Sequence, residues 1–185
     1  HLKWGKNMIK DRIALGVLSG LAGTIVKAAI DEISIKKKIS QSSFRTTAAS
    51  VWLSKKSEVH NPKGQVLGEL FDIGTGMLGG IGIVEMLSRR GRDHLVLKGA
   101  VAGITIGSII TAAISVFASN KVKPKDAASN LSYMACHAAY GIVTTLVAAK
   151  LGDKALFDTK PLNDYLPPTE STTEEDLSFL EENNS

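Results

Sequence analysis

The stretch GAVAGITIGSIITAAISVFAS, residues 99–119, contains no charged side chain and decides the fold. A helix rises 1.5 Å per residue, so about 20 residues cross the roughly 30 Å hydrocarbon core of a bilayer. Buried strands rarely exceed about ten residues, so a strand does not explain the run. In a chain of 185 residues it indicates a transmembrane helix.

Three further stretches have a similar length and apolar character. They lie at 13–35, 64–88 and 130–151, and together with 95–119 they predict four spans. We expect an all-α integral membrane protein built as a four-helix bundle, with a compact soluble all-α domain as the alternative. Basic residues before the first stretch are also typical of a signal peptide, but the three later spans favour an uncleaved anchor.

Charge divides the chain into two unlike parts. Residues 153–185 hold nine acidic residues and two lysines, a net charge of −7, and residues 1–152 carry a net charge of +11. The averages, 44% hydrophobic and 22% charged residues, resemble those of a soluble domain and conceal this division. We expect a membrane domain over 1–152 and an acidic, mostly extended C-terminal tail over 153–185.

Glycines recur at four-residue spacing in three of the stretches. In a soluble helix each glycine costs about 1 kcal/mol relative to alanine, whereas in lipid this spacing lets helix backbones approach closely. A phosphate-binding loop is poorly supported, because no Gly-Lys-Ser/Thr follows the glycines. We expect helix packing, in the bundle or between subunits, at Gly16, Gly20, Gly76, Gly80, Gly99, Gly103 and Gly107.

The connection over residues 36–63 is long for a helical bundle. Four of its apolar residues share one helical face: Phe44, Ala48, Val51 and Trp52. The spacing predicts a short amphipathic helix that lies either in the membrane interface or against the bundle. Trp4 and Trp52 are predicted interfacial anchors.

Positive charge does not by itself orient the protein, since ten basic residues fall on each side of the predicted spans. The basic N-terminal segment and the Arg89–Arg92 turn lie directly at helix ends, where the positive-inside rule is strongest. We therefore expect both termini in the cytoplasm.

Ionisable side chains of three predicted helices lie at one depth. Lys27, Asp72 and His137 are each about seven or eight residues from the helix end that faces the long connection, which corresponds to about 12 Å. Glu69 lies one turn from Asp72, and Tyr140 lies close to His137, so both extend the layer. Charged groups inside a membrane cost about 2.5–3.5 kcal/mol each on insertion scales and usually pair.

Two interpretations of this layer remain open. A buried Lys27–Asp72 ion pair, with His137 hydrogen-bonded to it, would hold the helices in register. A water-accessible cavity would instead carry protons, an ion or a small polar ligand. A metal site at Glu69, Asp72 and His137 would lack a second histidine at this depth. The sequence also contains no C-x-x-C-H motif, which attaches haem covalently. We therefore expect no metal and no cofactor.

Basic residues crowd the turn between the second and third spans: Arg89, Arg90, Arg92, His94 and Lys98. They are predicted either to bind anionic lipid head groups or to determine topology. No aromatic interleaving accompanies the basic residues, so we expect no nucleic-acid partner. No G-x-S-x-G motif occurs, and we assign no catalytic residue.

The order of several short motifs resembles the small four-span membrane proteins of Gram-positive, often spore-forming bacteria, loosely the YqhR-like proteins of unknown function. The motifs are the glycine-rich first helix ending in Lys27, Lys55-Lys56, Gly64 to Asp72, Gly91-Arg92-Asp93-His94, Leu97-Lys98-Gly99, Lys123-Pro124-Lys125-Asp126, His137-Ala138-Ala139-Tyr140-Gly141 and Leu151-Gly152-Asp153. The resemblance covers about residues 11–155 and implies four spans in a bacterial inner membrane, with no activity to carry over.

These patterns favour a non-enzymatic structural or accessory membrane subunit. We expect it to contact membrane lipids, anionic ones included, and to form homo-oligomers or join a membrane complex. A small transporter or proton pathway through Lys27, Asp72 and His137 is the alternative.

Overall fold

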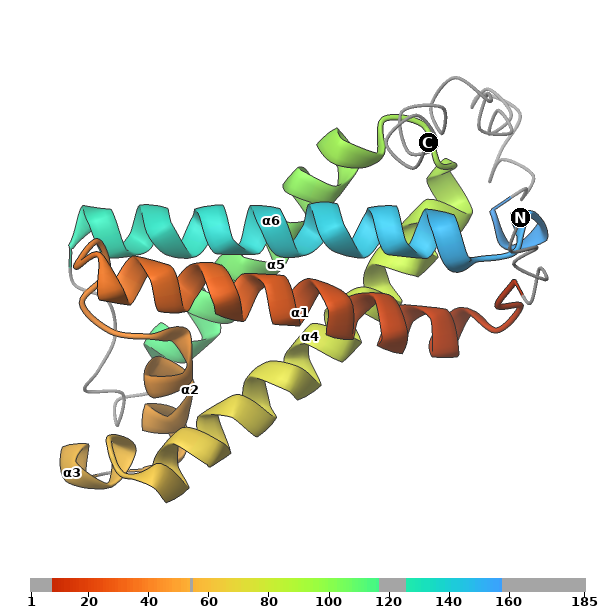
Figure 1. Ribbon diagram of the computed structural model, residues 1–185. Coiled ribbons are helices and arrows are strands. Elements are labelled where there is room, and N and C mark those ends of the chain that lie inside the picture. The colour runs from red at the N-terminus through yellow and green to blue at the C-terminus, as the bar shows by residue number, and fades with distance from the viewer. Residues whose placement is uncertain (1–7, 54, 117–125, 158–185) are drawn as a thin grey trace, which may run out of the picture.

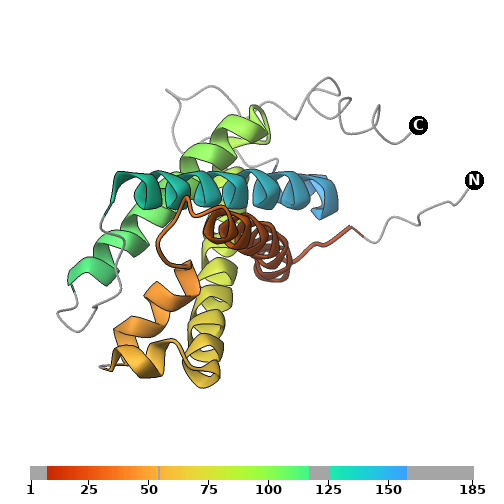
Figure 2. The same ribbon diagram turned by 60° about the vertical axis from the view of Figure 1, so that its left-hand side comes forward.

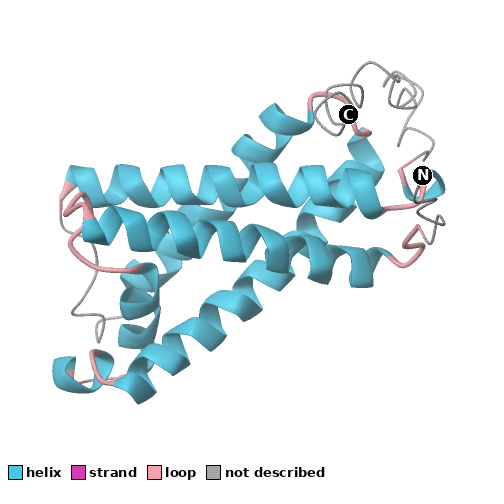
Figure 3. Ribbon diagram, in the orientation of Figure 1, coloured by secondary structure: helices cyan, strands magenta, loops and turns pink. Residues whose placement is uncertain are grey.

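The computed structural model describes residues 8–53, 55–116 and 126–157, and every regular element in these ranges is helical (Figure 3). Figure 1 shows the elements in order: α1 (Arg12–Lys36), α2 (Phe44–Trp52), α3 (Lys56–Val59), α4 (Pro62–Arg90), α5 (Leu95–Val116), α6 (Ala127–Leu151) and the short 3-10 helix η1 (Lys154–Leu156).

Four of these helices, α1, α4, α5 and α6, are long and apolar enough to cross a membrane. Their bounds lie within three residues of the predicted spans wherever the chain is described. The chain therefore has the architecture of a multi-pass membrane protein, as its sequence predicted. Trp4, residues 117–119 of the third predicted span and most of the acidic tail lie outside the described residues.

The helices begin where the sequence supplies a capping side chain. In each case a side-chain oxygen accepts the backbone N–H three residues further on, and the caps are Asp11, Ser43, Asn61 and Asp126. Pro62 follows directly at the first position of α4, where its missing N–H costs nothing. Gly91 ends α4 with φ 72°, a left-handed conformation that favours glycine.

The long helices alternate in direction (Figure 1). The start of α1, the α4–α5 turn and the end of α6 therefore lie at one end of the molecule, which we call the termini end. There Ile9 donates its backbone N–H to the Leu151 carbonyl at 2.9 Å, and Asp153 donates to the Ile9 carbonyl at 3.0 Å. The α1–α2 loop and α3 lie at the opposite end, the loop end.

Glycine permits the two closest interfaces between these helices. A Cβ added to Gly20 on α1 would meet the carbonyl oxygen of Gly76 on α4, and one added to Gly103 on α5 would meet the carbonyl oxygen of His137 on α6. Backbones in contact leave no room for a side chain.

All seven glycines predicted to pack helices lie on these α1–α4 and α5–α6 faces within the chain: Gly16, Gly20, Gly76, Gly80, Gly99, Gly103 and Gly107. The faces are filled by the chain's own helices. They are therefore not the surfaces through which a second subunit would bind.

The amphipathic helix α2 packs against α4 near the loop end (Figure 2). Phe44 and Ala48 are buried, in one cluster with Ile114 of α5 and Tyr133 of α6. Trp52, at the other end of α2, is 62% exposed. The Phe44–Ala48 part of the apolar face thus lies against the bundle, the second of the two predicted placements, while Trp52 faces outward.

Candidate functional site

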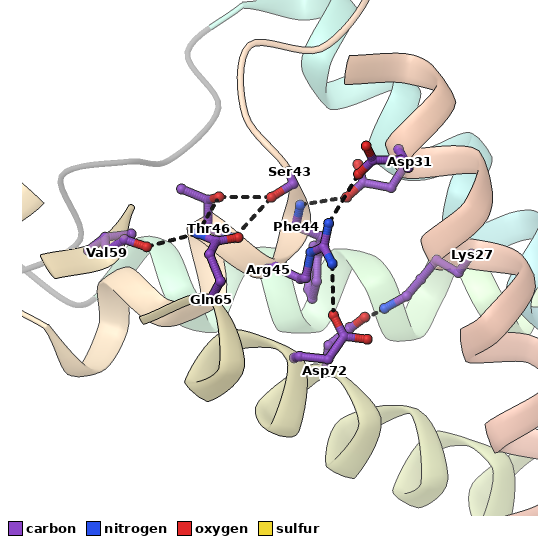
Figure 4. A network of polar contacts seen from close by, with 11 residues as sticks. Lys27, Asp31, Ser43, Phe44, Arg45, Thr46, Val59, Gln65 and Asp72 are labelled. Carbon is purple, nitrogen blue, oxygen red and sulfur yellow. Dashed lines mark hydrogen bonds and ion pairs between the residues drawn. The ribbon is translucent and has the colours of Figure 1, made fainter. Parts of the chain in front are cut away.

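Lys27, Asp31, Asp72 and His137 form a buried polar cluster between the helices. At its centre, Lys27 of α1 and Asp72 of α4 form an ion pair (Figure 4). The two side chains are 5% and 3% exposed. The Lys27 ammonium also lies 4.4 Å from the centre of the Phe44 ring, in a cation–π contact. Two helices thus bring opposite charges together at positions that the sequence had placed at equal distances from the loop end.

Asp31, one turn after Lys27, lies beside this pair and holds the start of α2. Its Oδ2 accepts the backbone N–H of Phe44 at 2.7 Å, a contact visible in Figure 4. Its other oxygen, Oδ1, is buried and has no hydrogen-bond partner among the described residues. The cluster therefore contains two carboxylates and one ammonium, with one carboxylate oxygen unpartnered.

Glu69 was predicted to extend this layer, but the structure pairs it elsewhere. Arg45 of α2 lies 3.4 Å from Glu69 and 3.1 Å from Glu32 of α1, measured between guanidinium nitrogen and carboxylate oxygen. The three side chains are 35–44% exposed, so this network is partly hydrated and contributes little to stability. Glu69 lies one turn nearer the loop end than Asp72, where α2 supplies the arginine.

His137 of α6 is 3% exposed, and its ring packs edge-on against Phe44 with 5.2 Å between the ring centroids. Its Nδ1 lies 2.9 Å from the carbonyl oxygen of Tyr133 and donates to it. In that neutral tautomer Nε2 is a hydrogen-bond acceptor, and it is buried without a partner among the described residues. His137 does not hydrogen-bond to the Lys27–Asp72 pair.

The two tyrosines beside His137 tie α6 to other elements. Tyr140 donates its hydroxyl to the carbonyl oxygen of Gly76 on α4 at 2.6 Å. Tyr133 donates to the carbonyl oxygen of Ser42, just before α2, at 2.8 Å. Both phenols therefore satisfy backbone carbonyls in the interior and connect helices that are far apart in the sequence.

His137 lines three cavities: a small one shared with Thr75, Gly76 and Tyr140, an inner one beside the ion pair, and an outer one that is open. The inner one is also lined by Lys27, Asp31 and Asp72, and its volume of about 10 Å³ holds about one water molecule. The outer one is an open groove of about 370 Å³ between α5 and α6. Its polar lining includes Ser108, Thr111, Ser115, Asn130 and Tyr133. The imidazole thus borders both the α5–α6 groove, whose lining is mainly apolar, and the cavity beside the ion pair.

In the basic turn at the termini end, Arg92 and Lys98 make internal contacts, whereas Arg89, Arg90 and His94 are exposed. Arg92 is 3% exposed. It lies over the ring of Phe157 at 4.8 Å and donates to the carbonyl oxygen of Ala149 at 3.3 Å. Arg89 pairs with Glu85 at 2.8 Å. Arg92, predicted to contact lipid head groups, therefore faces inward and holds the end of α6.

Lys98 is occupied by the same turn. Its ammonium donates to the carbonyl oxygens of Arg90 at 2.7 Å and Gly91 at 3.2 Å, and also to Asp93. Burial acts to raise the pKa of Asp93, but the hydrogen bond and charge of Lys98 outweigh it and lower that pKa below its ordinary value. The carboxylate therefore stays ionised at neutral pH and offsets the charge of Lys98.

Replacing Arg92 with glutamine is expected to lower the free energy of unfolding by about 1–2 kcal/mol, because the cation–π contact and a buried hydrogen bond are lost. The measurement is a denaturant titration in detergent followed by circular dichroism. Arg89→Gln removes an equal charge from an exposed pair and should cost less than about 0.5 kcal/mol. Equal losses in the two variants would show that Arg92 has no special structural role.

The cluster offers a buried cation, two carboxylates, an imidazole and room for one water. Within the part of the chain that the structure describes, no group of three or more His, Cys, Asp or Glu residues is arranged to hold a metal ion. Comparisons of the chain with protein-family models, with curated proteins and with solved structures find no match, so its function is inferred from these residues alone.

Proposed function

We propose that this chain is a non-enzymatic structural or accessory subunit of a membrane complex, and that Lys27 and Asp72 lock α1 against α4. The closed state of the ion pair supports this, since the side chains are 5% and 3% exposed. The adjoining cavity of about 10 Å³ is too small for a solute larger than water. Sliding either helix would leave a buried charge unpaired, which is strongly unfavourable.

The outer face of α5 is available for contact with lipid or with a partner. This helix packs mainly on α6 and leaves large apolar side chains outside: Val96, Leu97, Val101, Ile109 and Val116, each at least 48% exposed. Lipid or an apolar helix of another subunit would cover this face. We place the protein in a bacterial cell membrane with cytoplasmic termini, on the basis of the motif resemblance and the basic residues at the termini end.

The subunit proposal is tested by native electrophoresis of mildly solubilised membranes. The chain should migrate in a species well above its own mass of 19.7 kDa plus detergent. The matched control is the purified chain in the same detergent, which distinguishes a homo-oligomer from a complex with other proteins. A monomer in both samples would overturn the proposal.

A proton or ion pathway is the second candidate, and the position of His137 favours it. The imidazole separates the open α5–α6 groove from the inner cavity, and its Nε2 is buried without a partner among the described residues. The ring borders both spaces, and a proton on Nε2 would lie in the same cluster as the carboxylates of Asp31 and Asp72.

Liposomes loaded with a pH-sensitive dye separate the two candidates. For a structural subunit we expect proton flux equal to that of empty liposomes, both for the wild type and for Asp72→Asn. For a pathway, wild-type flux should exceed that background and fall to it in His137→Phe, which keeps an aromatic ring in place. Flux that survives in His137→Phe would exclude His137 as the carrier.

A further inference from the structure

A groove between α4 and α5 at the termini end is separate from the polar cluster. It has a volume of about 570 Å³, and its lining is mainly apolar. The residues that matter here are Gly82, Met86 and Arg90 of α4 and Leu97, Val101 and Ile106 of α5. The groove begins near the basic α4–α5 turn, at Arg90 and Leu97, and extends along the two helices to Gly82 and Ile106.

Helix packing elsewhere keeps this groove open. α4 packs on α1 and α5 packs on α6, so the two helices have few contacts with each other beyond their turn. Gly82 contributes directly, because a Cβ added there would meet no atom within 4 Å. The chain's own described side chains therefore leave an apolar channel on its outer surface.

The dimensions of the groove suit one lipid chain. Its α4 wall runs over eight residues from Arg90 back to Gly82, which is about 12 Å of helix. One leaflet of the hydrocarbon core is about 15 Å thick, half of the full core. An acyl chain that starts at the level of the turn would lie along the groove for most of its leaflet.

Two basic residues, Arg90 and Lys98, line the groove where it meets the α4–α5 turn. Lys98 donates to two backbone carbonyls and to Asp93, and Arg89 is paired with Glu85. Arg90 lines the groove, is exposed and has no ion-pair partner among the described residues. A guanidinium in this position binds phosphate oxygens well, because its planar donors match their geometry.

We propose that the α4–α5 groove binds one anionic phospholipid, with an acyl chain between Met86 and Val101 and the head group on Arg90. The site goes beyond the structural role proposed above and does not depend on it. It also narrows the predicted lipid contacts from the whole basic turn to one exposed arginine above an apolar groove.

Tryptophan quenching by brominated lipids tests the site in the full chain. The native tryptophans are replaced (Trp4→Phe, Trp52→Phe), and Leu97→Trp, at an exposed position of the lining, places a single reporter at the edge of the groove. Bilayers of phosphatidylcholine receive increasing amounts of brominated phosphatidylglycerol or of brominated phosphatidylcholine. We expect the reporter to show about fivefold preference for phosphatidylglycerol, the effect of one cation near the membrane surface.

Two pairs of matched variants distinguish a defined lipid site from non-specific attraction between anionic lipids and the basic surface of the protein. Arg90→Gln should reduce the preference to about one, whereas Arg89→Gln, which removes the same charge from a paired residue, should keep it. Gly82→Leu should fill the groove and lower quenching by both lipids. Gly74→Leu, at another α4 glycine with no atom within 4 Å of an added Cβ, should leave quenching unchanged.

Three results would overturn the proposal. Equal affinity for the two lipids would show that the head group is not recognised. Equal losses in Arg90→Gln and Arg89→Gln would indicate diffuse surface charge instead of a site. A reporter that neither lipid quenches would show that protein, from a second copy or from another segment, covers the groove.

Discussion

Replacing Lys27 with methionine is expected to lower the free energy of unfolding by about 3–5 kcal/mol. The cost arises because Asp72, 3% exposed, would be left in the interior without its ion-pair partner. Asp72→Asn should also be destabilising, since it removes the ion-pair partner of Lys27 and leaves Asp31 as the one carboxylate of the cluster. A titration with sodium dodecyl sulfate in mixed micelles, followed by circular dichroism, measures both changes.

The double variant Lys27→Met/Asp72→Asn distinguishes a pair from two independent residues. With both charges gone, neither member of the pair is left without its partner, although Asp31 still loses the nearby cation. The loss should therefore be smaller than the sum of the two single losses by at least about 1 kcal/mol. Glu69→Gln on the same helix is the control, because its pair with Arg45 is partly exposed and should contribute less than about 1 kcal/mol. Additive losses in the double variant would show that the Lys27–Asp72 ion pair does not stabilise the contact between α1 and α4.

Gly103→Ala is expected to destabilise the α5–α6 interface by about 2–3 kcal/mol, although alanine favours helices over glycine. The added Cβ would fall on the carbonyl oxygen of His137, a backbone atom that can move away only if α6 moves with it. The displacement would also pull the imidazole of His137 off Gly107, since a Cβ at Gly107 would likewise meet that ring. The same detergent titration measures the loss.

Gly74→Ala is the matched control for this prediction. A Cβ at Gly74 would meet no atom within 4 Å, so only the helix propensity changes, and the protein should be stabilised by up to about 1 kcal/mol. The two substitutions are chemically identical and should differ in sign. A similar result for both would show that the close α5–α6 approach is absent in the folded protein.

Part of the polar site could be predicted by counting residues from the ends of the helices. Lys27 and Asp72 lie at matching distances from the loop end of their helices. Because an unpaired charge inside a membrane is costly, their pairing could be anticipated. Glu69 shows where this reasoning stops. Its partner, Arg45, comes from α2, whose position against α4 depends on the burial of Phe44 and Ala48 and not on depth in a span.

His137 and Arg92 depend on tertiary structure in the same way. Helical spacing placed His137 level with the ion pair, yet its Nδ1 bonds to its own helix and its Nε2 faces no donor among the described residues. Arg92 belongs to a basic turn that the sequence assigns to the surface. Phe157, 65 residues further on, folds back beneath its guanidinium and buries it.

By itself the sequence determined the four membrane-length helices and their alternation, because bilayer thickness and the need to satisfy backbone hydrogen bonds act on each segment locally. It also marked the glycines as packing residues. Only the tertiary structure decided that those glycines join α1 to α4 and α5 to α6 within one chain, and that α4 and α5 diverge. The physical reason is that the partner of a glycine face or a buried charge is whichever helix lies beside it, and that neighbour is chosen by the packing of the whole chain.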